Sequence, residues 1–513
     1  MCGIVAAVTR RNVTGILLEG LQRLRYRGYD SAGLCVIDPT TGKLIRTRRV
    51  GDVDELIKAC DTDHTGVIGI AHTRWATHGK PTIENAHPHV SQDKVTIVHN
   101  GIIENHHLLR QQLQTTYEFE TDTDTEVLVH LLDREISAAG DLTLGVSNAL
   151  IQLKGAFAIT VMHVDYPSKL LAARVGSPLV VGIGIGENFV ASDVQALRPV
   201  TNRFLFLEEG EIVELTATDI SIKGLNRTAI DNRTIELEDV QDIAISKGHF
   251  RHFMLKEIYD QPDALRQTLE GRLTSDSVLV PSFGVDAESI FQKVKAVQIV
   301  ACGSSYYAGM VARYWFEEIA GIPCNVEVAS ELRYRKITVL PNTLLVTISQ
   351  SGETADTLAA QRAAIDRNYL ASLCICNVPN STMVREADLC LMTHAGIEVC
   401  VASTKAFTNQ LTDLMMLVLA LGHYNHMTPS THKEIVQTLK ELPRCLQEVL
   451  LLDEHIQEMA EKFVEKQHAL FLGRGVHYPI ALEGSLKLKE ISYIHAEGYP
   501  AGELKHGPLA LVD

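Results

Sequence analysis

An internal repeat in the second half of the chain constrains the fold more than any other feature. A shift of 172 residues aligns Gly303 with Gly475 and Tyr306 with Tyr478 without a gap. The same shift aligns residues 330–333 (SELR) with residues 502–505 (GELK). Such self-similarity indicates one structural unit used twice. We therefore expect two copies of an α/β unit, each built on a parallel sheet.

Each expected unit contains apolar strands that break into loops of small and hydroxyl residues. Residues 297–301 run into the loop 302–305 and then an amphipathic helix to about Ile319, and residues 344–348 run into the loop 349–354. Residues 401–405 form a third segment of small and hydroxyl residues of this kind. Hydroxyls and bare amides at a helix N-terminus favour a phosphate group, although each loop alone could be an ordinary helix cap. In a parallel sheet, ligands bind at the carboxyl ends of the strands.

The second copy of the repeat is expected to be incomplete. The counterpart of the loop 349–354 would lie beyond Asp513, the last residue of the sequence. We therefore expect either that the natural polypeptide continues or that this chain is a fragment.

Composition limits the class of protein. The 513 residues are 46% hydrophobic and 21% charged, enough for several globular domains. The net charge of −16 disfavours binding to nucleic acid or to anionic lipid. The ten cysteines show no paired C-x-x-C spacing, which indicates reduced thiols and a cytoplasmic location. No signal peptide and no membrane-spanning stretch is expected.

The first half mixes short strand patterns with helical ones, which predicts layered sheets covered by helices. A polar stretch over residues 226–242 is typical of a linker. We expect a first domain over residues 2–240, a linker with lead-in helices over 241–285, a first α/β domain over 286–455 and the incomplete second one over 456–513.

Cys2 is the most informative residue of the first half. If the initiator methionine is removed, Cys2 carries both a thiol and a free α-amine, whose pKa of roughly 7.7–8.0 lets it accept the thiol proton. For the pair Met1-Cys2 alone, an ordinary buried cysteine at the start of a strand is the better interpretation.

Three further motifs accompany Cys2. Arg74 follows the predicted strand 67–71, where a guanidinium can hold a carboxylate, although it could be a plain surface arginine. Asn100 and Gly101 end another predicted strand and could donate to an oxyanion, or could form a simple turn. Asp124 lies at the start of a predicted helix, where it could cap the helix or pair with a ligand ammonium.

These motifs, together with residues 26–33 (YRGYDSAG), resemble the class II glutamine amidotransferases, which are N-terminal-nucleophile hydrolases with an αββα sandwich. The resemblance implies that Cys2 is the nucleophile, that Asn100 and Gly101 form an oxyanion hole, and that the product is ammonia. It assigns Trp75 to gating an ammonia passage, where a packed core indole is the competing interpretation. It assigns these residues to glutamine: Arg74, Thr77, His78 and Asp124.

The second half resembles tandem sugar isomerase (SIS) domains, which bind phosphosugars. With the first half, and with residues 253–262 (FMLKEIYDQP) and 487–497 (KLKEISYIHAE), the chain is similar to the family that transfers glutamine nitrogen to fructose 6-phosphate. The substrates implied are L-glutamine and fructose 6-phosphate, and no cofactor is implied. The resemblance assigns these residues to the sugar phosphate: Cys302, Ser304, Ser305, Ser349, Gln350, Ser351, Thr354, Val401 and Ser403.

Three residues near the end of the chain have roles implied by the resemblance. Glu490 would move a proton between C1 and C2 of the sugar. His506 would open the sugar ring in the neighbouring subunit's site, which implies a homodimer. Lys487 lies one helical turn before Glu490 and would act in catalysis or simply pair with that carboxylate. The family's Schiff-base lysine lies in a tail that this sequence does not contain, so we expect glutamine hydrolysis but little amino-sugar synthesis from these 513 residues.

Two alternatives stay open. Other class II amidotransferases share the first half, but the chain lacks the paired-acid strand of the phosphoribosyl enzymes and the S-G-G-x-D-S loop of asparagine synthetases. A non-catalytic phosphosugar sensor would need no N-terminal thiol. The histidines at 87, 89, 106 and 107 lack metal-ligand spacing, so no metal site is expected.

Cys2 should react selectively with a glutamine-like electrophile. A diazo-ketone analogue of glutamine should label Cys2 alone among the ten cysteines, because only this thiol has an adjacent amine base. Peptide mass spectrometry identifies the labelled residue. Labelling that spreads to Cys302 or Cys400, or that persists in Cys2→Ala, would contradict the amidotransferase assignment.

Overall fold

The structure is a computed structural model of the chain. It describes residues 2–25, 28, 30–60, 64–74, 80–225, 247–365, 367–425 and 427–512, and the backbone of residues 229–230 and 235–236. The chain divides into two compact units, Met1–Ile245 and Ser246–Asp513.

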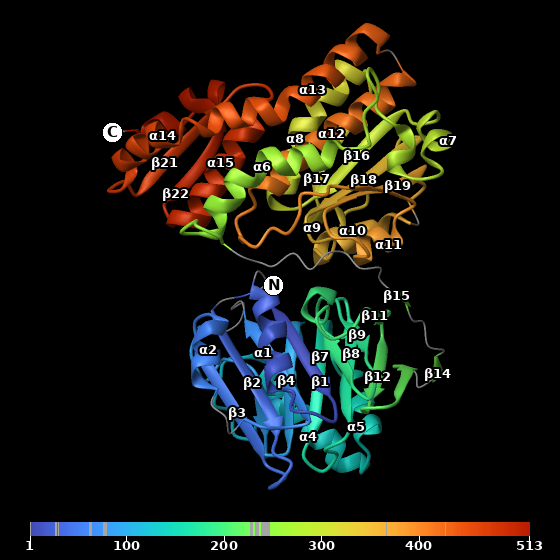
Figure 1. Ribbon diagram of the computed structural model, residues 1–513, viewed down its shortest axis with the longest axis vertical. Coiled ribbons are helices and arrows are strands. Elements are labelled where there is room, and N and C mark those ends of the chain that lie inside the picture. The colour runs from blue at the N-terminus through green and yellow to red at the C-terminus, as the bar shows by residue number, and fades with distance from the viewer. Residues whose placement is uncertain are drawn as a thin grey trace. The chain divides into compact units, whose positions relative to one another are not determined.

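The first unit is a sandwich of two largely antiparallel sheets with helices on both outer faces (Figure 1). The first sheet has the order β15 (Ile235–Glu236), β11 (Arg203–Phe206), β9 (Val180–Ile183), β10 (Asn188–Ala191), β1 (Gly3–Val8), β4 (Ile68–Arg74), β2 (Ser31–Ile37), β3 (Leu44–Val50). The second has the order β14 (Ala229–Ile230), β13 (Ile220–Gly224), β12 (Glu211–Leu215), β8 (Leu170–Val175), β7 (Gly155–His163), β6 (Val95–Ile103), β5 (His89–Ser91).

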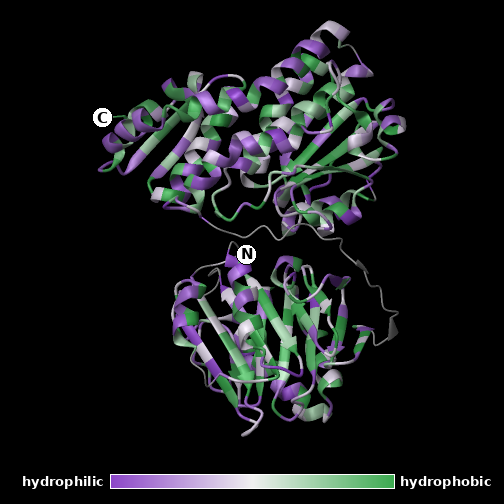
Figure 2. Ribbon diagram, in the orientation of Figure 1, coloured by the Kyte–Doolittle hydropathy of each residue, from purple (hydrophilic) through white to green (hydrophobic). Residues whose placement is uncertain are grey.

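Three apolar layers hold this sandwich together. Side chains that alternate along β1 divide between two of them: Ile4 and Ala6 pack toward the second sheet, and Val5 and Ala7 pack under the helices α1 (Thr14–Arg23) and α2 (Val53–Ala59). The third layer lies beneath α3 (His106–Leu113), α4 (Asp124–Ala139) and α5 (Leu142–Leu150). Strands that are buried along nearly their whole length, such as β1 and β8, are accordingly apolar (Figure 2). The predicted αββα sandwich is confirmed.

The stretch 226–242, predicted to be a linker, includes the two short strands β14 and β15. They extend the second and the first sheet, at β13 and at β11 respectively. A polar segment without periodicity can therefore still donate edge pairs, because sheet-edge hydrogen bonds need only backbone groups.

The second unit contains a five-stranded sheet in which all pairs are parallel. Its order is β17 (Cys324–Val328), β16 (Ala296–Ala301), β18 (Thr343–Ser349), β19 (Ala371–Cys376), β20 (Leu389–Met392). The helices and helical turns of this unit are α6 (Phe253–Leu269), η3 (Val280–Phe283), α7 (Ala287–Phe291), α8 (Gly303–Trp315), η4 (Phe316–Ala320), α9 (Ala329–Leu332), α10 (Ala355–Ala364), α11 (Thr382–Glu386), α12 (Lys405–His423), α13 (Pro429–Leu450), α14 (Asp453–Ala460), η5 (Glu461–Phe463), α15 (His477–Ser492), η6 (Ala501–Lys505) and η7 (Pro508–Leu511).

The repeat predicted from the sequence is present in the structure. β21 (His468–Gly473) and β22 (His495–Pro500) form a parallel pair, as β16 and β17 do. The registers agree under the same shift, since Val297 pairs with Cys324 and Ala469 pairs with Ala496. Gly303 and Gly475 both have φ +56°. The second copy therefore repeats the first strand, helix and second strand of the first copy.

No helix among the described residues has both the length and the apolar character needed to cross a bilayer. α12 is the most apolar long helix of the second unit, and it is buried against α8 and α6. Its apolar surface is therefore used in the core of this unit.

Candidate functional sites

The first candidate site forms where the N-terminus meets the second sheet of the sandwich. Cys2 directly precedes β1, which lies between β10 and β4. Asn100 on β6 donates from Nδ2 to the carbonyl oxygen of Cys2 at 2.9 Å. Residues 98 positions apart in the sequence are thus brought together by the facing of the two sheets.

The backbone at Gly101 differs from the structure expected from the sequence. The sequence suggested that the strand ends at Asn100-Gly101, but β6 continues to Ile103 and pairs with β7 along its whole length. Gly101 has φ +125°, and a Cβ there would lie 2.0 Å from the carbonyl oxygen of Ala156. A plain Asn-Gly turn was therefore also wrong, because glycine is required here by strand geometry and close packing.

Arg74 and Asp124 lie buried beside this N-terminus. Arg74 is the last residue of β4 and is 4% exposed. Burial lowers the pKa of Arg74, and the neighbouring acidic groups of Cys2, Asp30 and Asp124 oppose that shift. The structure therefore groups a guanidinium, a carboxylate and the thiol residue that are far apart in sequence.

Asp124 also has a structural role at the start of α4. Its Oδ2 accepts a hydrogen bond from the backbone N–H of Ile103 at 2.8 Å. Thr123 caps the helix, with Oγ1 accepting from the N–H of Glu126 at 3.2 Å. The capping role considered for this segment is thus held by Thr123, one residue before Asp124. Trp75, Thr77 and His78 lie outside the described residues.

The second candidate site lies at the carboxyl ends of β16 and β18. Cys302 directly follows β16 and is the N-cap of α8, and Ser349 ends β18. Thr357 on α10 donates to Cys302 Sγ at 3.8 Å, which links the two loops. Burial raises the pKa of Cys302, so this thiol is not set up as a nucleophile.

The loop after β18 folds around its own hydroxyl groups. Ser349 Oγ lies 2.9 Å from Thr354 Oγ1 and accepts from the N–H of Gly352 at 3.0 Å. Ser351 Oγ accepts from the N–H of Glu353 at 3.2 Å. Gly352 has φ +66°, and a Cβ there would lie 1.9 Å from Ser381 Oγ. The result is a tight turn of hydroxyls and amides at the N-terminus of α10, the arrangement that binds phosphate groups.

Charged residues of α15 meet the loop after β16. Lys487 Nζ lies 2.6 Å from Glu490 Oε2 and 3.5 Å from Glu483 Oε1. Lys487 Nζ also donates to Ser304 Oγ at 3.2 Å, and Ser304 Oγ donates to Glu483 Oε1 at 2.8 Å. Ser304, Lys487 and Glu490 are therefore brought together as the sequence suggested. The ion pair considered for Lys487 and Glu490 is also present.

Glu483 was missed by the sequence analysis. It is 6% exposed, and burial raises its pKa despite the neighbouring Lys487. Glu483, Lys487 and Glu490 are spaced i, i+4, i+7, so they share one helix face. This spacing could have indicated from the sequence that Glu483 lies beside Lys487 and Glu490.

The loop 399–404 is fixed by two buried carboxylates. Glu257 Oε1 on α6 accepts from the N–H groups of Val399 at 2.5 Å and Cys400 at 3.1 Å. Glu398 Oε1 accepts from the N–H of Thr404 at 2.8 Å, and Glu398 Oε2 accepts from Ser403 Oγ at 3.1 Å. The loop that carries Val401 and Ser403 is thereby held to α6.

This loop also faces α15. The positive charge of Lys487 acts on the Cys400 thiol and opposes the burial that raises the pKa of Cys400 to about 11. Glu257 is a second residue that the sequence analysis missed. The segment 253–262, which contains it, was used only to support the family resemblance. A glutamate within a helix gives no sequence signal for a loop more than 140 residues away.

His506 is not joined to this cluster by any contact among the described residues. It follows η6, its side chain is exposed, and its backbone N–H donates to the carbonyl of Glu503 at 2.9 Å. Ser305 lies in the first turn of α8, and Gln350 accepts at its carbonyl from the N–H of Asn377 at 3.3 Å.

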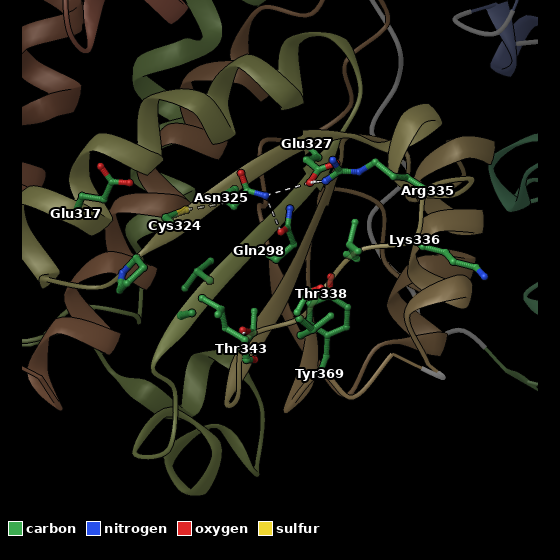
Figure 3. Close-up of a pocket in the computed structure, with 16 residues that line it drawn as sticks. Gln298, Glu317, Cys324, Asn325, Glu327, Arg335, Lys336, Thr338, Thr343 and Tyr369 are labelled. Atoms are coloured by element: carbon green, nitrogen blue, oxygen red, sulfur yellow. Dashed lines mark hydrogen bonds and ion pairs between the residues drawn. The ribbon is translucent and has the colours of Figure 1, made fainter.

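A separate cavity of about 390 Å³ lies at the other ends of the strands (Figure 3). Residues at the starts of β16 and β18 line it, including Gln298 and Thr343. Asn325 donates to Gln298 Oε1 at 3.0 Å, and Arg335 pairs with Glu327. The cavity lies at the end of the sheet opposite the loops that follow β16 and β18. Across the described residues, no cluster of three or more His, Cys, Asp or Glu side chains is arranged to hold a metal.

Each half of the chain matches a known protein family. Residues 72–199 match the glutamine amidotransferase domain, and residues 290–420 and 462–513 match the SIS domain. The chain is 58% identical to a protein of Idiomarina loihiensis and 56% identical to one of Pseudomonas putida, both named glutamine–fructose-6-phosphate aminotransferase (isomerizing). Each alignment covers 100% of this chain and 84% of the relative.

A solved structure is also similar. The C-terminal domain of glucosamine-fructose-6-phosphate aminotransferase from Francisella tularensis is 52% identical, with a TM-score of 0.51. The match covers 52% of this chain and 75% of that domain. The two predicted SIS units are therefore confirmed by sequence and by fold.

Replacing Glu257 should separate its hydrogen bonding from its charge. Glu257→Ala leaves the N–H groups of Val399 and Cys400 without their acceptor and should lower the free energy of unfolding by roughly 2–4 kcal/mol. Glu257→Gln keeps an acceptor oxygen and should stay within about 1 kcal/mol of the parent. Urea unfolding measures both. An alanine variant as stable as the parent would show that the anchor is unimportant.

The same pair of variants tests the charge of Glu257. Burial raises the pKa of Glu257 to about 7, above its ordinary value of 4.5. Folding therefore favours the protonated form, so this contribution to stability is present at low pH and is lost as pH rises through about 7. Between pH 5 and 8 the parent should lose stability relative to Glu257→Gln. Parallel curves for the two proteins would contradict the raised pKa.

Proposed function

The chain belongs to the glutamine–fructose-6-phosphate aminotransferase (isomerizing) family, and we propose that it moves the amide nitrogen of glutamine to fructose 6-phosphate. The ketose becomes an aldose, so the products are glucosamine 6-phosphate and glutamate. The observation that carries this function is the 58% identity along the whole chain to a relative of that name. The union of an amidotransferase unit with phosphosugar-binding units supports it.

Cys2 is the proposed nucleophile of the first unit. Its thiol would attack the side-chain amide carbon of glutamine, with the α-amine of Cys2 taking the thiol proton, and ammonia would leave. Water would then hydrolyse the thioester to glutamate. Asn100 and Gly101 would stabilise the oxyanion, and Arg74 and Asp124 would hold the α-carboxylate and α-amine of glutamine. The proposal for Thr77, His78 and Trp75 rests on the family resemblance alone.

The sugar phosphate is proposed to bind in the second unit. Its phosphate would lie at the turn formed by Ser349, Gln350, Ser351 and Thr354, where hydroxyls and N–H groups converge. Cys302, Ser304 and Ser305 would line the pocket from the neighbouring loop. Val401 and Ser403 would lie beside the sugar.

Glu490 is proposed to carry the proton between C1 and C2. A keto-to-aldo shift needs one base that removes a proton from one carbon and returns it to the next. Lys487 Nζ, 2.6 Å from Glu490 Oε2, would position that carboxylate. His506 would act in the site of a partner subunit, which makes a homodimer part of the proposal, as is a cytoplasmic location.

A phosphosugar sensor and a different class II amidotransferase are weaker alternatives. A sensor would not need a cysteine near the N-terminus whose backbone carbonyl accepts a hydrogen bond from Asn100. Another amidotransferase would have a different acceptor unit, whereas residues 290–420 match the SIS domain.

Isotope transfer tests the proposed reaction. With a chain that includes the C-terminal tail expected from the family resemblance, fructose 6-phosphate and glutamine labelled with ¹⁵N at the amide, the label should appear in glucosamine 6-phosphate. Cys2→Ala should abolish glutamate formation and transfer, because no thioester can form. Cys60→Ala is the matched control, since Cys60 is a half-buried thiol of the same unit outside the candidate site. Unlabelled amino sugar, or transfer by Cys2→Ala, would refute the mechanism.

A charge placed in the loop after β18 tests the phosphate site. Ser351→Asp puts a carboxylate beside the phosphate and should weaken fructose 6-phosphate binding at least about tenfold, since like charges at close range repel by several kcal/mol. Ser289→Asp, on an exposed face of α7, should bind as the parent does. Calorimetry measures both. Equal affinities for all three proteins would show that the loop is only a helix cap.

A further inference from the structure

A cluster of buried histidines lies behind the Cys2 site. His72 is 1% exposed, His87 5%, His89 3% and His99 3%. They come from β4, from β5 and the loop before it, and from β6. None of the roles described above uses them, and one of them, His72, contacts Asn100 directly.

The hydrogen-bond partners of His72 determine the orientation of the Asn100 amide. His72 Nε2 lies 2.9 Å from Asn100 Oδ1 and 3.2 Å from the carbonyl oxygen of His99. A carbonyl oxygen only accepts, so Nε2 must carry the proton. The Asn100 atom facing His72 is then the oxygen, and the amide nitrogen is directed at the carbonyl of Cys2.

The alternative amide orientation would be unfavourable on both sides. With Oδ1 and Nδ2 exchanged, the amide oxygen would face the carbonyl oxygen of Cys2, and the amide N–H would face the N–H of His72. The Asn100 nitrogen carries two hydrogens, and its bond to Cys2 uses one of them. Only the observed orientation leaves the second for an oxyanion.

The neighbouring histidines hold His72 in place. The rings of His72 and His87 stack with centroids 4.1 Å apart and an interplanar angle of 22°. His87 Nδ1 accepts from the backbone N–H of His99 at 3.3 Å, and its Nε2 lies 3.3 Å from Thr125 Oγ1. Thr125 Oγ1 in turn lies 2.9 Å from His99 Nδ1.

The rings of His72 and His87 are neutral at physiological pH. Burial lowers the pKa of His72 to about 3 and the pKa of His87 well below its ordinary value. Hydrogen bonds therefore select one tautomer of each ring, and no titration near pH 7 disturbs it.

We propose that His72 is a positioning residue that holds the Asn100 amide with its nitrogen toward the reacting centre, an inference that rests on the proposed glutaminase function. The hydrogen bonds of His72 go to Asn100 and to the carbonyl oxygen of His99. Its loss should therefore reduce stabilisation of the oxyanion and leave substrate binding and the thiol itself largely unchanged.

The test compares three variants of the full chain. His72→Leu removes the donor and should lower kcat for glutamine hydrolysis roughly 10- to 100-fold, with KM within about twofold. His72→Gln supplies an amide N–H at similar reach and should recover most of kcat. His89→Leu is the matched control, because His89 is equally buried but its Nε2 lies 3.3 Å from Thr123 Oγ1 rather than near Asn100. It should keep kcat near that of the parent.

Alkylation of Cys2 by iodoacetamide provides a second measurement. This displacement forms no oxyanion, so His72→Leu should react at the parental rate while glutamine hydrolysis falls. If the leucine variant does not fold, His72→Asn replaces it, since its shorter amide cannot reach Asn100. Parental kcat in a folded variant without the donor, or equal losses in His72→Leu and His72→Gln, would overturn the inference. A parent that hydrolyses no glutamine would instead refute the proposed function.

Discussion

The hydrogen bond from Asn100 to the carbonyl of Cys2 is the contact on which the first site depends, because it joins the N-terminus to the opposite sheet. It requires β1 to lie between β10 and β4, and it requires β6 to pass Asn100 without ending. Gly101 makes this possible, since a side chain there would collide with Ala156. The apolar layer between the sheets sets how closely the two strands approach.

The second unit places its candidate site by a different physical rule. Parallel strands present all their carboxyl ends at one edge, so the loops after β16 and β18 meet there with helix N-termini beside them. α15 belongs to the second copy of the repeat, yet its Glu483 and Lys487 bond Ser304 of the first copy. The two copies therefore share one cluster of polar groups, and neither copy alone contains it.

Much of this arrangement could be predicted from the sequence, and the omissions have a common cause. The strands of both units, the repeat and its register followed from apolar runs and from self-similarity. Glu483, Glu257 and His72 were missed because their partners lie far along the chain, at residues 304, 399 and 100. The end of β6 was misplaced because Asn100-Gly101 has turn propensity that pairing with β7 overrides.

The order of residues along the chain was enough to identify several chemical groups: a thiol at position 2, hydroxyl-rich loops after apolar strands, and a helix face bearing Lys487 and Glu490. These depend on local order along the chain. Which atoms face each other is visible only in the folded chain, as for Asn100 Oδ1 with His72 and for the carboxylate of Glu257 with the loop after Glu398. Such contacts depend on strand register and core packing, which arise from the whole unit at once.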